Sequence, residues 1–243
     1  MKSLAILAVL AAFSLGQAQT LFYGGDPDGR NGLVSGSNLA SAGQALTYDD
    51  FNLASNSNIT GFFGDWFVGS ADTTSTFTTA AYDIRTGIMD SGAGGTVTNI
   101  GTSVASGTVG ITAVSTGLTG FGLNIYRMTT GAVGINLAAG HYWLAVAPVG
   151  DGTNSIFLTT TSGTAGIGTQ AGIGSPLANG NSYFDAISVY GPTGWSRTDN
   201  ASVLNTGTWD FSYGVTGSPV PEPASMAVLG MGALALIRRR RRV

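Results

Sequence analysis

Oxygen donors gather in one glycine-rich stretch near the start of the chain, GGDPDGRNG. Asp26, Asp28 and Asn31 supply carboxylate and amide oxygens there, which are the ligands that Ca²⁺ collects. The stretch departs from the EF-hand pattern, because Arg30 stands where a third donor is needed and Ser37 stands where a bidentate Glu closes the loop. A calcium ion and an ordinary Asp/Asn-Gly turn therefore both stay open as interpretations.

A second group of residues has the chemistry to bind a sugar. Trp195 lies in the Gly/Pro-rich stretch YGPTGWSRTDN, which predicts a loop, and Arg197, Asp199 and Asn200 follow it. A flat ring stacks on the apolar CH groups of a sugar while polar side chains bind its hydroxyls. The alternative is that Trp195 folds back beneath the loop as part of the core.

Catalytic candidates are few. His141 is the only imidazole, and no G-x-S-x-G nucleophile motif occurs in the sequence. Asp49 and Asp50 are neighbours in a strand-like run, so their side chains point to opposite faces and cannot flank one glycosidic bond. We therefore predict that the protein is not an enzyme. A secreted glycosidase that uses two distant Asp residues is the less favoured alternative.

The elements that must hold these residues alternate apolar and polar side chains with a period of two, which is the period of a β-strand. In FGLNIYR, Phe121, Leu123 and Ile125 share one face, while Asn124 and Tyr126 share the other. No helical stripe longer than two turns occurs in the body of the chain. Strands are expected at residues 46–53, 59–68, 82–88, 121–127, 141–149, 155–160, 183–190 and 208–213. The sequence predicts an all-β fold, an antiparallel β-sandwich of jelly-roll type.

Composition limits the classes of function. Charged residues make up only 9% of the chain, against about 25% in an ordinary soluble domain. The formal charge of −3 includes six cations and one anion in the terminal segments, so the body between them carries −8. We do not expect so acidic a surface to bind nucleic acid or anionic lipid. The chain has no cysteine, which removes disulfides and thiolate metal sites.

The first residues, MKSLAILAVLAAFSLGQAQ, have the composition of a secretory signal peptide. Lys2 precedes an apolar run, and Gly16, Gln17 and Ala18 supply the small residues that a signal peptidase reads. We expect an N-terminal signal helix at 1–18 and cleavage after Ala18.

The last residues combine an apolar run with a basic cluster. From Ala224 to Ile237 the chain carries no charge, and this segment is about 21 Å long if it is helical. It is a short membrane span, because a hydrocarbon core is about 30 Å thick. By the positive-inside rule, the basic cluster keeps the C-terminus in the cytoplasm. The cluster consists of Arg238, Arg239, Arg240, Arg241 and Arg242.

The order of features at this end resembles the PEP-CTERM sorting signal of Gram-negative bacteria. Val220, Pro221, Glu222 and Pro223 come first, followed by the short hydrophobic helix and the terminal arginines. The resemblance implies recognition of the Pro-Glu-Pro motif by exosortase, a membrane-embedded transpeptidase-like enzyme whose hosts make exopolysaccharide and biofilm matrix. Two prolines bracket Glu222, so the segment is extended and its backbone stays open to an enzyme. A plain tail anchor with a proline-rich stem is the alternative.

The predicted organisation has five parts. A signal peptide (1–18) precedes the β-sandwich body (19–216), a linker with the Pro-Glu-Pro motif (217–223), a transmembrane sorting helix (224–237) and a cytoplasmic Arg cluster (238–243). We expect a non-enzymatic exported protein that passes through the inner membrane to the cell surface or the extracellular matrix. Signal peptidase and exosortase are its expected partners, exopolysaccharide its expected surroundings, and a carbohydrate-binding module the alternative function.

Overall fold

A computed structural model describes residues 18–39, 43–69, 72–73, 75–92, 96–168, 182–186, 194–199, 204 and 209–220. The predicted signal helix, the predicted sorting helix and the Arg cluster lie outside these residues. Within the described part of the chain, no helix is long and apolar enough to cross a membrane.

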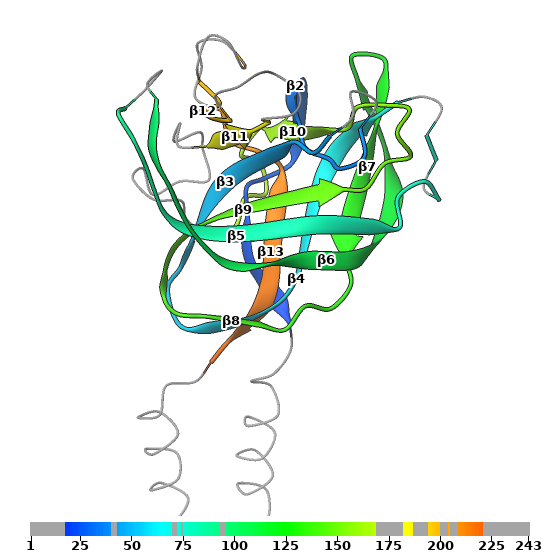
Figure 1. Cartoon of the computed structure of the whole chain (residues 1–243). Coiled ribbons are helices and arrows are strands. Elements are labelled where there is room, and N and C mark those ends of the chain that lie inside the picture. Colours follow the sequence, from blue (N-terminus) through cyan, green and yellow to red (C-terminus); the bar gives the residue numbers. More distant parts are fainter. Residues whose placement is uncertain are drawn as a thin grey trace, which may run out of the picture.

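The described residues form an all-β structure with one large antiparallel sheet of 13 strands (Figure 1). This result confirms the predicted all-β antiparallel class, whereas the jelly-roll connectivity stays a prediction. The strands are β1 (Gln19–Tyr23), β2 (Pro27–Val34), β3 (Leu46–Leu53), β4 (Ser57–Val68), β5 (Thr79–Asp90), β6 (Val97–Gly120), β7 (Leu123–Thr130), β8 (Ile135–Leu137), β9 (Gly140–Pro148), β10 (Phe157–Thr161), β11 (Tyr183–Asp185), β12 (Trp195–Arg197) and β13 (Tyr213–Pro219).

The sheet folds over on itself around a large apolar core. Its strand order is β1-β13-β4-β7-β6-β5-β9-β3-β11-β12, with β10 paired to β2 and β4, and β8 paired to β4. In Figure 1, β3, β9 and β5 cross in front of β13 and β4. The period of two separates the faces of β9: Leu144 and Val146 enter the main core, whereas Trp143 and Ala145 belong to a second, smaller cluster with Tyr48 of β3.

Strand β6 connects the two halves of the sheet. It is 24 residues long, pairs with β5 through its first part and pairs with β7 through its second part. The backbone N–H of Ile111 donates to the carbonyl of Thr78 beside β5, while the carbonyl of Gly110 accepts from the N–H of Gly131 beside β7. The two neighbours therefore lie on opposite edges of β6, and each covers only part of its length.

Several predicted boundaries were wrong. Trp195 was expected in a loop but lies in β12, where it pairs with Asp185 of β11. The Asp26 to Asn31 stretch was expected as a turn, yet β2 begins at Pro27. The strand expected at 208–213 starts only at Tyr213, because Phe211 forms an isolated bridge and gives its N–H to the carboxylate of Asp49.

Candidate functional site

The strongest functional feature of the sequence begins where the last strand ends. Strand β13 lies between β1 and β4, and its final pair joins Pro219 to Ser57 of β4. One further backbone hydrogen bond follows, from the N–H of Val220 to the carbonyl of Asn56 at 2.7 Å. The described backbone of the body therefore extends to the residue directly before Pro221.

Prolines mark the end of β13 and the motif that follows it in the sequence. Pro219 has no backbone N–H to donate to a neighbouring strand, and Pro221 and Pro223 lack one as well. Glu222 stands between two of these prolines in the sequence. The Val220 side chain is 44% exposed. The Pro-Glu-Pro motif therefore begins two residues after the end of the last strand of the body in the sequence.

Comparison with known protein families identifies this end of the chain. Residues 219–242 match the model of the PEP-CTERM protein-sorting motif. The C-terminus is a PEP-CTERM sorting signal. This motif implies an exported, surface-associated protein that is sorted and processed by exosortase. No curated protein and no solved structure matches the chain.

The match confirms the resemblance that the sequence predicted. It covers Val220, Pro221, Glu222 and Pro223 together with the five terminal arginines. All of these except Val220 lie outside the described residues. Their individual roles in recognition and in membrane orientation stay predictions.

The predicted signal peptidase site lies close to the sorting signal in the fold. Gln19, which would become the first residue after cleavage, begins β1 and pairs with Gly217 of β13. Thr20 pairs with Thr216 in the same ladder. Because β1 and β13 are antiparallel neighbours, the start and the end of the body lie side by side (Figure 1). Both predicted processing points therefore lie at one end of the sheet.

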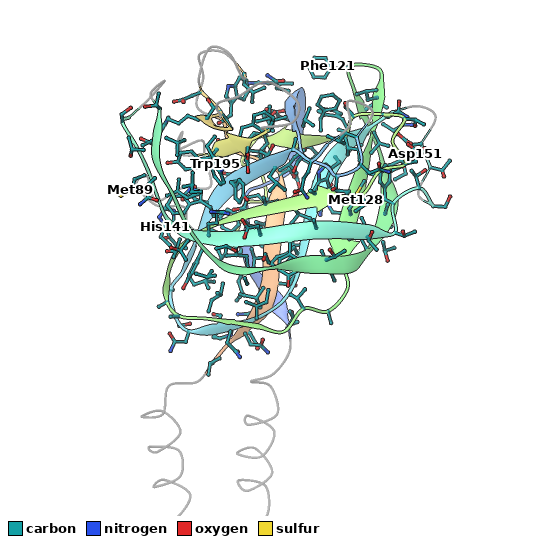
Figure 2. The ribbon with its side chains drawn as sticks, in the orientation of Figure 1. Met89, Phe121, Met128, His141, Asp151 and Trp195 are labelled. Carbon is teal, nitrogen blue, oxygen red and sulfur yellow. The ribbon has the colours of Figure 1, made fainter. Side chains whose placement is uncertain are left out.

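Trp195, the predicted sugar platform, is half-buried against other side chains. Its ring stacks on Tyr48, with 4.7 Å between the ring centroids and 29° between the planes. The guanidinium carbon of Arg85 lies 5.0 Å from the Trp195 ring centroid, within cation–π range. Figure 2 shows Trp195 beside the β11–β12 ribbon. These contacts pack Trp195 on the smaller apolar cluster.

The polar residues that follow Trp195 bind each other. Arg197 Nε and Nη2 donate to the two carboxylate oxygens of Asp199 at 2.9 and 2.8 Å, and Nη1 donates to Asp90 at 2.5 Å. Arg197 is 6% exposed and Asp199 is 8% exposed. Asn200 lies outside the described residues. The carbohydrate-contact residues stay a prediction, and one of them, Arg197, joins β12 to the end of β5 through Asp90.

The three predicted calcium ligands each accept a hydrogen bond from the protein. Asp26 Oδ1 accepts from the hydroxyl of Tyr23 at 2.8 Å, and Asn31 Oδ1 accepts from the N–H of Gly32 at 2.9 Å. Asp28 Oδ1 accepts from the hydroxyl of Thr160 at 2.7 Å. In the described ranges, no group of three or more His, Cys, Asp or Glu side chains could hold a metal ion. Calcium binding stays a prediction.

The catalytic candidates lie on β3, which carries Asp49 and Asp50, and on its neighbour β9, which carries His141. Asp50 Oδ2 is 2.8 Å from Nε2 of His141, whose ring contacts Trp143 at a centroid distance of 4.0 Å. Asp49 faces the main core and accepts from the N–H of Phe211 at 2.7 Å. Burial, and then the negative charges of Asp210 and Asp50, raise the pKa of Asp49 well above its ordinary value.

Sequence reasoning did not identify a buried ion pair between β4 and β7. Arg127 donates to both carboxylate oxygens of Asp65, at 2.6 and 2.7 Å, and Asp65 is 0% exposed. Ser212 donates to the same carboxylate, and the hydroxyl of Tyr23 accepts from Arg127. Burial raises the pKa of Tyr23 to about 12. The available signal was a lone charge inside the apolar run GFFGDWFV, which requires a buried partner.

Proposed function

We propose that this chain is a non-enzymatic cell-surface or extracellular-matrix protein. Its β body is exported, held briefly in the inner membrane by the tail, and released by exosortase into surroundings rich in exopolysaccharide. The observation that carries the proposal is the sorting motif that begins at residue 219, where β13 ends. The signal therefore follows the folded body without an intervening domain.

The ion pairs of the body support a structural role for its charged side chains. Arg85 Nε lies 2.6 Å from Asp83, and Arg127 Nε lies 2.6 Å from Asp65. Arg197 pairs with Asp90 and Asp199. The single histidine contacts a buried aspartate and a tryptophan. The pairs of Arg127 with Asp65 and of Arg197 with Asp90 join different strands, which favours a scaffold over a catalyst.

Composition supports the proposed surroundings. The body carries a formal charge of −8 once the terminal segments are set aside, which disfavours nucleic acid and anionic lipid as partners. Only 9% of the chain is charged, and many of the exposed residues of β6 are Ser, Thr or Asn. Such a surface is suited to a hydrated polysaccharide layer, where hydroxyl groups exchange hydrogen bonds with water and sugar.

The experiment compares the mature C-terminus of the wild type and of Glu222→Ala, recovered from an exosortase-bearing host and measured by mass spectrometry. We expect the wild-type chain to end near Val220 to Pro223 and the variant to stay uncut in the membrane. Ser225→Ala, a small change in the same tail outside the Pro-Glu-Pro motif, is the matched control and should be processed normally. An intact Arg run on the wild-type protein would overturn the proposal.

Association with exopolysaccharide is tested separately by co-sedimentation of the processed protein with the host polymer. Retention in the polymer pellet is expected. Protein that is correctly processed but stays in the supernatant would remove the exopolysaccharide from the proposal and leave the sorting intact.

A further inference from the structure

Strand β6 leaves part of its backbone edge without a strand partner. Its residues 103–109 lie beside β5 on one side only, because Gly131 bonds the opposite edge at Gly110 and β7 covers it from Ile111 onwards. Within the part of the chain that the structure describes, no strand or isolated bridge pairs with the second edge of residues 103–109. We call this segment the open edge. In Figure 1, β6 runs along the outer side of β5.

The direction of the backbone groups follows from the two hydrogen bonds that flank the open edge. The N–H of Ile111 points toward β5, and the carbonyl of Gly110 points toward the β7 side. Since backbone groups alternate along a strand, the N–H and C=O of Ser106 and Thr108 also point to the β7 side, where the described residues provide no further strand. Both residues are exposed. Among the described residues, these backbone donors and acceptors of the open edge have no strand partner.

Three other edge strands, β2, β8 and β12, carry features that discourage pairing with a second chain. Strand β2 contains Pro27 and the charged residues Asp28 and Arg30, while β8 and β12 are each only three residues long. Proline, charge and short length are the usual protections of an exposed edge. Strand β6 is 24 residues long and contains no charged residue and no proline. The sequence has no charge anywhere between Asp90 and Arg127.

We propose that the open edge pairs with the open edge of a second copy of this chain, which joins two bodies into one continuous sheet. The charge of the body and the lack of charge on the open edge favour a second copy as the partner. Two bodies of formal charge −8 repel each other, so an uncharged edge is the place where they approach at the least cost. A basic partner would instead be attracted to acidic side chains, which this edge lacks. Two-fold symmetry makes the paired strands antiparallel, the arrangement that already holds between β5 and β6.

The regular part of the ladder decides where the pairing is centred. Register shifts between Ile84 and Arg85 and between Met89 and Asp90 distort the hairpin toward its tip. The ladder from Ala105 to Gly110 is uninterrupted. A contact of this length lies at the small end of specific interfaces, below about 1,200 Å² of buried surface. We therefore expect reversible association that becomes extensive where chains are concentrated, as at a cell surface.

The absence of cysteine from the chain makes a direct test possible. Full-length Thr108→Cys is expressed in the host and treated with a short bismaleimide, and linked dimers are separated by mass. Thr129→Cys is the matched control, because Thr129 is an exposed threonine of β7 that has strand neighbours on both sides. We expect several-fold more linked dimer from Thr108→Cys. Equal yields, or a linked product whose mass is not that of two copies, would overturn the proposal.

A second comparison tests the edge itself in a chain that keeps its fold. Ser106→Cys is combined with Thr108→Lys, which adds a charge to the open edge, or with Thr129→Lys, which adds the same charge to a strand without an open edge. The double variant with Thr108→Lys should lose most of its linked dimer, and the double variant with Thr129→Lys should keep it. Resistance of both chains to protease checks that each is folded. Unchanged linking in the presence of Thr108→Lys would contradict edge pairing.

Discussion

The tail and the body of this protein differ in how their residues obtain a function. In the tail, a short run of neighbouring residues carries the sorting signal, and residues 219–242 can be matched without any knowledge of the fold. In the body, charged and polar residues that could bind a ligand instead contact residues distant in sequence, as Asp65 forms an ion pair with Arg127. The difference shows that a linear signal can be read from sequence, whereas the role of a body residue depends on which strand lies beside it.

The largest effect should come from the buried ion pair of the body. Arg127→Leu removes the partner of Asp65, which is 0% exposed and would keep an uncompensated charge. We expect a loss of about 3–5 kcal/mol in the free energy of unfolding, because a buried pair broken on one side leaves the other charge desolvated. Urea denaturation of the processed wild-type and variant proteins measures this change in the free energy of unfolding.

The control for that change is Arg30→Leu. Arg30 is exposed on β2, and its substitution should alter the stability by no more than about 0.5 kcal/mol. If both variants lost the same stability, the prediction that paired charges of the body contribute more to stability than solvated ones would be wrong.

An intermediate effect is expected at Trp195. Trp195→Ala removes the stacking on Tyr48 and the cation–π contact with Arg85, which should lower the stability by roughly 2 kcal/mol. Trp195→Phe keeps a stacked ring and should lose less. Thermal unfolding and retention on host exopolysaccharide are measured together. An unchanged melting temperature with weakened retention would instead favour the carbohydrate-binding module.

A smaller and pH-dependent effect is expected at Asp90. Burial raises its pKa, but hydrogen bonds from Tyr183, the N–H of Gly92 and Arg197 lower it by more, so the net pKa is below the ordinary value. A depressed carboxyl pKa stabilises the fold above the unfolded pKa, and this contribution is lost as pH falls through the folded pKa. Asp90→Asn should therefore cost about 1 kcal/mol at neutral pH and progressively less in acid.

Denaturation curves of wild type and Asp90→Asn at a series of pH values measure this dependence. Asp49 should give a pH dependence of stability with the opposite sign. Its raised pKa favours the folded state in acid, and this contribution is lost as pH rises toward the folded pKa. A stability difference between Asp90→Asn and wild type that did not change with pH would show that the charge of Asp90 does not hold the hairpin.

The smallest effect should come from removal of calcium. Asp26, Asp28 and Asn31 already accept hydrogen bonds from protein groups. We expect EDTA to leave the melting temperature unchanged, whereas a ligand bound to the folded state would raise it by mass action. A melting temperature that falls in EDTA, and that added calcium restores but added magnesium does not, would establish a calcium site in the body.

Much of the fold could be predicted where bulky apolar residues alternate with polar ones. Strand β3 was predicted with its observed bounds, Leu46–Leu53, and β9 within one residue. Strand β6 was missed, because Gly, Ser and Thr fill it and too few bulky side chains mark its buried face. Its position is set by pairing with β5 and β7, which periodicity within the segment does not reveal.

The candidate sites were predictable to a different degree. The sorting signal needed only local sequence, and the comparison confirmed it. The side chain of Arg197 looked available for a ligand, since nothing in the local sequence indicates that Asp90 on a distant hairpin approaches it. Such pairings depend on register between strands and become visible only in the folded chain.

The central claim is that the tail alone directs sorting, and that the body contributes a stable fold with no part in recognition. The most direct measurement transfers residues 219–243 to an unrelated exported fluorescent protein and determines its mature C-terminus and surface fluorescence in an exosortase-bearing host. We predict cleavage at the Pro-Glu-Pro motif and display at the surface, as for the whole chain. A fusion that stays uncut in the inner membrane, while the native chain is processed beside it, would contradict the claim and make the β body part of the signal.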